Sequence, residues 1–106
     1  MAKYLITAAY TAEGAKGLLK ESGTKRRQAA EQAIKSAGGT MEAFYFAFGD
    51  NDAYVIVDAP DHATIAAASV AINASGAVHS KTIVLLSPEE MDQAIKKTVN
   101  YRAPGH

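Results

Sequence analysis

The chain has 106 residues, of which 11 are lysine or arginine, 11 are aspartate or glutamate and none is cysteine. This length suits one domain with one core, zero net charge offers no basic field for nucleic acid, and the lack of cysteine excludes disulfides and thiolate metal sites. With no signal-peptide pattern and no apolar run near the roughly 20 residues that span a bilayer, we expect a single cytoplasmic domain over residues 1–106, without a membrane partner.

The first third of the chain predicts a strand and a helix joined by a loop. Residues 3–10 are a short apolar run, which is typical of a strand buried on both faces. Residues 11–23 have the glycine content of a loop, with room for a helical turn at 15–20. Thr24 is a candidate N-cap of the helix that follows, because alanines and one isoleucine recur at three- and four-residue spacing as far as Gly38.

The middle of the chain predicts a β-hairpin. Residues 40–48 alternate with a period of two, which places large aromatic side chains on one side and small residues with Tyr45 on the other. Residues 49–52 have turn chemistry, and residues 53–59 return as a second apolar strand. These two strands should therefore pair directly.

The second half of the chain predicts a helix, a strand and a last helix. Asp61 is a candidate N-cap of a helix that runs to about residue 75, and residues 77–86 form the fourth strand. The Ser-Pro-Glu-Glu sequence at 87–90 supplies an N-cap, a first-turn proline and a capping-box glutamate. We expect this final helix to extend to about residue 98.

The predicted order is that of an α+β ferredoxin-like fold with an extra C-terminal helix. Two helices then cover one face of a four-stranded antiparallel sheet. Both sides of the hairpin strands carry apolar residues, so a bare second face would leave a larger apolar patch than monomers tolerate. We therefore predict a homodimeric α/β barrel, or a higher oligomer, in which two sheets pack face to face around a cleft.

The helix predicted after Asp61 has an unusual surface, because no charged residue occurs between Asp61 and Lys81. A helix that faces solvent normally shows a charged stripe. One interpretation is contact with a partner, and the other is an alanine-rich surface helix. The first interpretation agrees with the predicted self-association.

Four strand residues are candidates for a ligand site. His79 and Lys81 share one face of the fourth strand, where His79 could transfer a proton and Lys81 could hold an anion. Tyr45 lies between small residues and has room to face a ligand, and Asp58 could pair with a histidine or lysine across the cleft. The plainer interpretations are a hydrogen-bonded histidine beside a rim lysine, a core tyrosine and a strand-end turn residue.

Lys25, Arg26 and Arg27 fall in the first turn of a predicted helix, where positive charge opposes the helix dipole. Either an anion binds at Arg26 and Arg27, or acidic residues such as Asp50 and Asp52 lie close; a solvated cluster is the plainer alternative. The three histidines share no metal-ligand spacing, so we expect no metal and no cofactor.

Five stretches support a resemblance when they are taken together: residues 3–5, 10–19, 43–49, 73–78 and 87–90. With them the chain resembles the GYD domain family along nearly its whole length. The resemblance implies a ferredoxin-like fold of the dimeric α/β barrel kind, and it implies no settled activity. Similar barrels serve as monooxygenases, isomerases, haem enzymes and small-molecule sensors.

The chain departs from the family's Gly-x-Tyr-Asp motif, because Asn51 stands where the motif has tyrosine. The leading hypothesis is a homodimeric domain that binds a small, partly apolar molecule, either between sheet and helices or between two sheets. One alternative is a cofactor-independent isomerase or monooxygenase-like enzyme, with His79 as base and Tyr45 or Lys81 stabilising negative charge. Another is a structural subunit that assembles through the charge-free helix.

Overall fold

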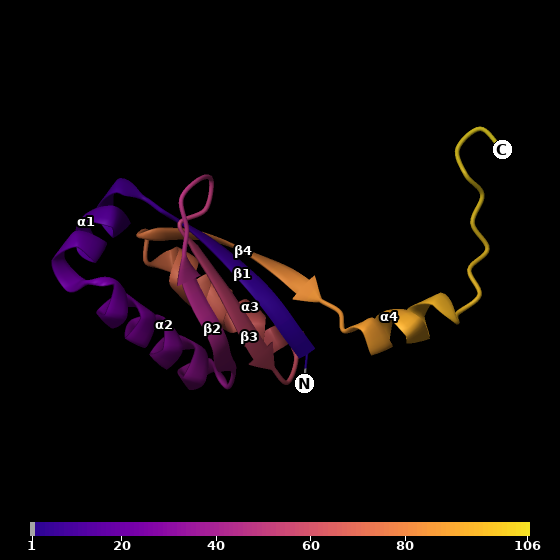
Figure 1. Ribbon diagram of the computed structural model, residues 1–106, viewed down its shortest axis with the longest axis horizontal. Coiled ribbons are helices and arrows are strands. Elements are labelled where there is room, and N and C mark those ends of the chain that lie inside the picture. Colours follow the sequence, from indigo (N-terminus) through magenta and orange to yellow (C-terminus); the bar gives the residue numbers. More distant parts are fainter. Residues whose placement is uncertain (1) are drawn as a thin grey trace.

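The structure, a computed structural model, describes residues 2–106 (Figure 1). Its elements are β1 (Ala2–Tyr10), α1 (Ala12–Glu21), α2 (Gly23–Ala37), β2 (Thr40–Phe46), β3 (Ala53–Ala59), α3 (His62–Ala74), β4 (Val78–Leu85) and α4 (Pro88–Ile95). The strands form one sheet in the order β2-β3-β1-β4, and every pairing is antiparallel. The α+β ferredoxin-like prediction, with its extra C-terminal helix, is confirmed.

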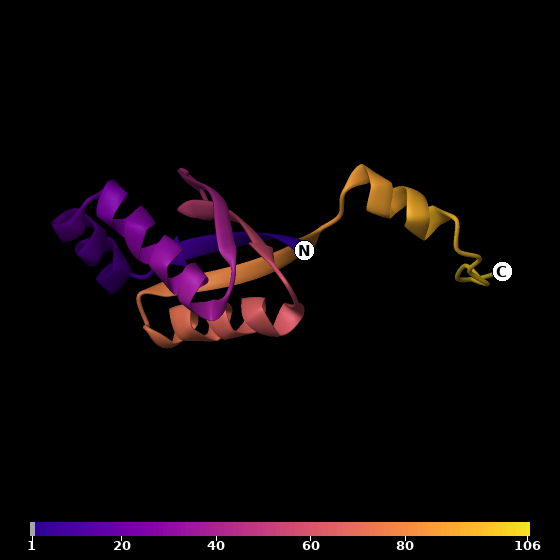
Figure 2. The same cartoon turned by 90° about the horizontal axis from the view of Figure 1, so that it is seen from below.

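The helices α2 and α3 lie on one side of the sheet, and we call this side the covered face (Figure 2). In the described part of the chain, no helix lies over the other side, which we call the open face. None of the helices formed by residues 2–106 is long and apolar enough to cross a lipid bilayer.

The core fills the space between the covered face and the two helices. Its most deeply buried large side chains are Tyr4, Ile6, Ile34, Val55, Val57 and Ile65. Alternate residues of a strand point to the same face, so every second residue of β1 and β3 enters this layer. Burying a side chain of this size contributes about 1.5–3 kcal/mol, which makes this layer the main source of stability.

Three local signals in the sequence act as expected. The Asp61 carboxylate accepts a hydrogen bond from the backbone N–H of Thr64 at 2.8 Å, which caps α3. Gly38 ends α2 in the left-handed conformation, with φ 104°. Ser87 and Glu90 form the predicted capping box, at N···O distances of 3.0 and 3.1 Å. These predictions are confirmed because each needs only residues that are near in sequence.

The loop predicted at residues 11–23 is wrong, because α1 occupies most of it. The Thr11 side chain accepts a hydrogen bond from the Gly14 N–H at 3.2 Å and so begins the helix. The Thr11 N–H donates to the Ala77 carbonyl at 3.0 Å, which fixes α1 to the start of β4. A Cβ on Gly14 would lie 2.0 Å from that carbonyl oxygen, so the glycine permits close packing instead of breaking the helix.

The N-cap of α2 is Ser22, and the prediction of Thr24 is wrong. The Ser22 hydroxyl accepts a hydrogen bond from the Lys25 N–H at 3.3 Å. Its φ is 119°, a strained value for a residue with a side chain, because α1 and α2 are joined by a single residue. At the other end of the chain, α4 ends at Ile95 and not near residue 98.

Both edges of the sheet are irregular. β2 has a bulge between Met41 and Ala43 and ends at Phe46, so the strand predicted to residue 48 is too long. On the edge strand β4, the Asn73 side-chain carbonyl accepts from the Ser80 N–H at 2.8 Å.

The segment after β4, residues 86–106, projects away from the rest of the chain, and we call it the arm (Figure 1). The longest dimension is 56 Å and the radius of gyration is 16.8 Å. A compact domain of this length has a radius of gyration of about 13 Å, so the arm is a real extension. No residue of α4 is buried.

Candidate functional site

A cavity of about 60 Å³ lies between the covered face and the helices α2 and α3. Side chains from all three contribute to its lining, including Ile6, Phe44 and Val55 from the sheet, Ala30 and Ala33 from α2, and Ile72 from α3. Because the alanine side chains of α2 are short, a gap remains between this helix and the larger side chains of the sheet. The cavity is therefore almost entirely apolar.

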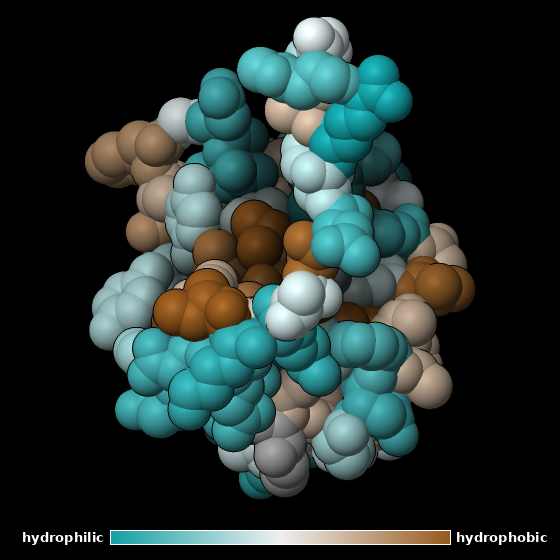
Figure 3. All heavy atoms as spheres, turned by 90° about the vertical axis from the view of Figure 1, so that its right-hand side faces the viewer, coloured by the Kyte–Doolittle hydropathy of each residue, from teal (hydrophilic) through white to brown (hydrophobic). Residues whose placement is uncertain are grey.

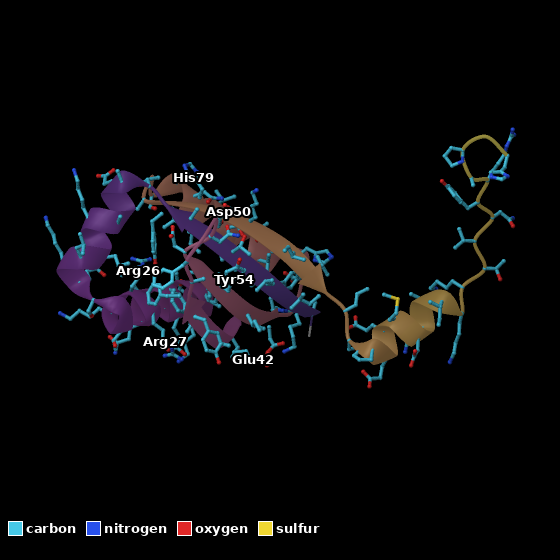
Figure 4. The ribbon with its side chains drawn as sticks, turned by 45° about the horizontal axis from the view of Figure 1, so that its top comes forward. Arg26, Arg27, Glu42, Asp50, Tyr54 and His79 are labelled. Carbon is cyan, nitrogen blue, oxygen red and sulfur yellow. The ribbon has the colours of Figure 1, made fainter. Side chains whose placement is uncertain are left out.

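Among the described residues that line the cavity, Arg26 alone carries a charge. It lies on the side of α2 toward the sheet and is half-buried, whereas Arg27 points away and is exposed (Figure 4). Arg27 forms a salt bridge with Glu31 at 3.7 Å. Within residues 2–106, no carboxylate forms a salt bridge with Arg26. The two arginines predicted together as an anion site thus have different environments, and only Arg26 reaches the cavity.

Tyr10 lies beside Arg26 at the same cavity. Burial raises the pKa of the Tyr10 phenol, and the nearby positive charge of Arg26 offsets part of that shift. The phenol is therefore protonated at neutral pH and can donate a hydrogen bond. Asp52 fixes this end of β1, because its carboxylate accepts from the Tyr10 backbone N–H at 2.8 Å.

A second hollow of about 110 Å³ adjoins the first, and both are lined by Tyr10, Arg26 and Val78. It lies against α1, which contributes Gly17 and Glu21 to its lining. Tyr10 and Arg26 therefore stand between an apolar cavity under the helices and a more polar hollow beside α1.

The open face presents two rows of side chains across the four strands. In the first row the register joins Tyr45, Tyr54, Thr7 and Lys81. The second row is apolar and consists of Ala43, Ile56, Leu5 and Ile83. The exposed fractions are 69% for Tyr45, 37% for Tyr54 and 48% for Ile83. An uncovered apolar strip therefore runs across the sheet.

His79 and Lys81 both lie on the open face, and both side chains are exposed. His79 is next to Ala9 of β1, whereas Asp58 is next to Lys3, six residues along the same strand. At about 3.3 Å per residue this separation is about 20 Å. Within residues 2–106, no carboxylate forms a hydrogen bond with His79. The structure does not bring these candidates together with an orienting acid.

Asp58 takes part in an ion cluster at the other end of the open face. The Lys3 ammonium contacts Glu42 and lies 3.0 Å from the Asp58 carboxylate. Hydrogen bonds to Glu42 and then to Asp58 raise the pKa of Lys3, so its charge persists at any physiological pH. This cluster joins β1 to β2 and β3 at their outer ends.

Asn51 lies in the turn between β2 and β3, and its side-chain N–H₂ donates to the Tyr54 hydroxyl at 3.4 Å. The turn thus approaches the tyrosine row of the open face. Figure 4 shows Asp50 of this turn and His79 of β4 near the same end of the sheet.

Sequence reasoning missed Tyr10 and Phe44 as cavity residues. The available signal was the run of alanines on α2, which implies space wherever the helix crosses large strand residues. That signal does not say which strand residues face the alanines, because the register of the strands and the angle at which α2 crosses the sheet depend on the whole fold.

Comparison with known proteins agrees with this architecture. The family model described as GYD domain matches residues 4–95. The crystal structure of the Mycobacterium protein MtbAldR superposes with a TM-score of 0.58 at 18% sequence identity, covering 97% of this chain. The chain spans only 57% of the length of that protein, and the likeness concerns the fold. No curated protein matches the sequence.

Proposed function

Because the chain belongs to the GYD domain family, we propose that it acts as a homodimeric binding domain for a small, partly apolar molecule with one anionic group. The site is the cavity between the covered face, α2 and α3. The observation that carries the proposal is the half-buried Arg26 at an otherwise apolar cavity, without a carboxylate partner within residues 2–106.

The chemistry of the cavity selects the ligand class. A guanidinium presents parallel N–H donors that match a carboxylate, and Tyr10 supplies a further donor at the same place. Apart from Ser80, the remaining lining is apolar. A site with an apolar wall and a few converging polar groups is the usual form of a small-molecule pocket.

The volume limits the size of the apolar part. An engineered cavity of about 150 Å³ accepts benzene, and the present cavity is about 60 Å³. A short aliphatic group therefore fits better than an aromatic ring. The adjoining hollow of about 110 Å³ leaves room on the far side of Arg26 for the rest of the molecule.

Dimerisation is supported by the open face. Its apolar strip, with Ile83 48% exposed beside the partly covered Leu5 and Ile56, has no partner within the described chain. Sheets of this kind are stabilised when a second sheet covers them. The symmetric solution is a second copy of the same face.

Titration with isovalerate tests the proposed ligand class, since this probe joins a short branched chain to a carboxylate. We expect isovalerate to raise the melting temperature and its uncharged amide to raise it far less. Arg26→Gln should abolish the effect, whereas Arg27→Gln, a matched change on the exposed side of α2, should preserve it. Equal binding by the Arg26 variant would overturn the proposal.

Native mass spectrometry of protein purified from its own host complements the titration. We expect a dimer that retains a small acidic molecule. A dimer released from its natural source with both cavities empty, together with no response to short-chain carboxylates, would count against ligand binding.

A second candidate function is a self-assembling structural subunit, and one observation favours it. The exposed side of α3 is made of Ala66, Ala67, Val70 and Ala71, and Val70 is 68% exposed. This surface offers close packing without charge. Light scattering distinguishes the two, because assembly through α3 predicts particles larger than a dimer that disappear with Val70→Lys.

A further inference from the structure

The helix α4 has an apolar stripe that its own chain leaves uncovered. Met91 and Ile95 lie four residues apart in α4 and are 47% and 73% exposed, and Val99, in the segment that follows the helix, is 76% exposed. Residues at this spacing lie on one side of a helix. An isolated helix of eight residues is marginal in water, so a well-capped one with an apolar stripe indicates a packing partner.

The position of the arm indicates where that partner lies. Figure 2 shows α4 beyond the end of the sheet and displaced toward the side opposite α3, which is the side of the open face. A hollow of about 280 Å³ remains at the root of the arm, and Lys3, Leu86 and Glu90 contribute to its lining. Seen from the end of the arm, apolar groups gather at the centre of the molecule with hydrophilic groups around them (Figure 3). A second molecule that covers the open face would therefore lie beside α4.

The area of the open face gives a second reason. Four strands about 4.8 Å apart and seven residues long, at about 3.3 Å per residue, present a surface of about 440 Å². A stable interface buries about 800 Å² on each partner. The flat outline of the sheet is about half of this value, and the arm is the nearest apolar surface that can add to the contact.

We propose that α4 of each protomer packs against the partner subunit, so that two copies of the chain exchange their arms. The inference rests on the homodimer proposed above. Charge supports it, because Glu89 and Asp92 of α4 are exposed acidic groups and His79 and Lys81 are exposed basic groups on the open face. A two-fold axis uses both arms at once and leaves neither stripe in water.

The first test is the dimer dissociation constant, measured by analytical ultracentrifugation of the full chain. Met91→Ser combined with Ile95→Ser should raise this constant at least tenfold. Gln93→Ser, on the opposite side of α4, is the matched control and should leave it unchanged. Because none of the three residues is buried within its own chain, the circular dichroism of the body should stay the same.

The outcomes separate the two proposals. If the unmodified chain is a dimer and the double variant dissociates no more easily than the control, arm exchange is wrong and the dimer stands. If the unmodified chain is a monomer at micromolar concentration, the homodimer fails and the arm exchange fails with it.

The second test uses the lack of native cysteine. A benzophenone maleimide is attached to Ile95→Cys, and this protein is mixed with isotopically heavy, unmodified chain. Photolysis should give products that join light and heavy chains, and the same label at Gln93→Cys should give far fewer. Products that join two parts of one light chain would overturn the proposal, because α4 would then pack on its own body.

Discussion

Replacing Gly14 by alanine is expected to destabilise the protein, although alanine is the better helix former. The alanine Cβ would lie 2.0 Å from the Ala77 carbonyl oxygen, where ordinary contact begins at 3.4 Å. α1 must therefore move by about 1.4 Å relative to the start of β4. That movement breaks two hydrogen bonds of Thr11: its N–H donates to the Ala77 carbonyl, and its hydroxyl donates a single bond shared between the carbonyls of Gly76 and Ala77.

The magnitude follows from three contributions. Overpacking against a fixed backbone atom costs about 1–3 kcal/mol. Loss of two hydrogen bonds costs about 1 kcal/mol for each. The better helix propensity of alanine returns about 1 kcal/mol. We expect a net loss of about 2–4 kcal/mol in the free energy of unfolding for Gly14→Ala.

Gly17→Ala is the matched control, because no atom lies within 4 Å of its added Cβ in the same helix. It should stabilise the protein by about 0.5–1 kcal/mol. Urea unfolding at one fixed protomer concentration, followed by far-ultraviolet circular dichroism, measures both variants. Equal stability of the two alanine variants would refute the reasoning, since helix propensity alone would then account for both.

Three further predictions concern single contacts. Tyr4→Phe removes the 2.6 Å hydrogen bond between the Tyr4 hydroxyl and Nδ1 of His62 and should lower the free energy of unfolding by about 1 kcal/mol in urea titrations. Hydrogen bonds from Thr64 lower the pKa of Asp61, so its stabilising effect is present above the usual carboxyl pKa and is lost as pH falls through the lowered value. Asp61→Asn keeps a capping acceptor and should flatten this acid dependence, and an unchanged acid transition would contradict the capping role. Ser22→Gly relieves the positive φ of 119° and should raise the free energy of unfolding by about 1 kcal/mol, measured by thermal unfolding. A lower free energy of unfolding in this variant would show that the conformation is not strained.

The parts of the fold that were predictable are those encoded by neighbours in sequence. Asp61 and the Ser87 to Glu90 box identify helix starts because their hydrogen bonds span three residues. Period-two patterns gave the hairpin, and the order of elements then led to the correct sheet class.

The errors came from contacts between distant residues. Gly14 looks like a loop residue until the Ala77 carbonyl is beside it. The bulge in β2 places Met41 and Phe44 in the covered layer, which simple alternation forbids. Neither feature has a local signature.

The candidate site also combines features that neighbours in sequence predict with features that depend on distant contacts. The basic cluster was visible in the sequence, but only the packing of α2 separates Arg26, which enters a cavity, from Arg27, which faces Glu31. His79, Lys81, Tyr45 and Asp58 were assigned to strands correctly, and the register spreads them across the open face. Their proposed roles in ligand binding remain predictions for mutagenesis.

The edges of the sheet limit how this protein can polymerise. An unprotected outer strand recruits further strands side by side, which is the route to fibrils. Here the bulge between Met41 and Ala43 interrupts the ladder on one flank, and Asn73 occupies the Ser80 N–H on the other. Both features oppose the addition of a further strand at the edges of the sheet.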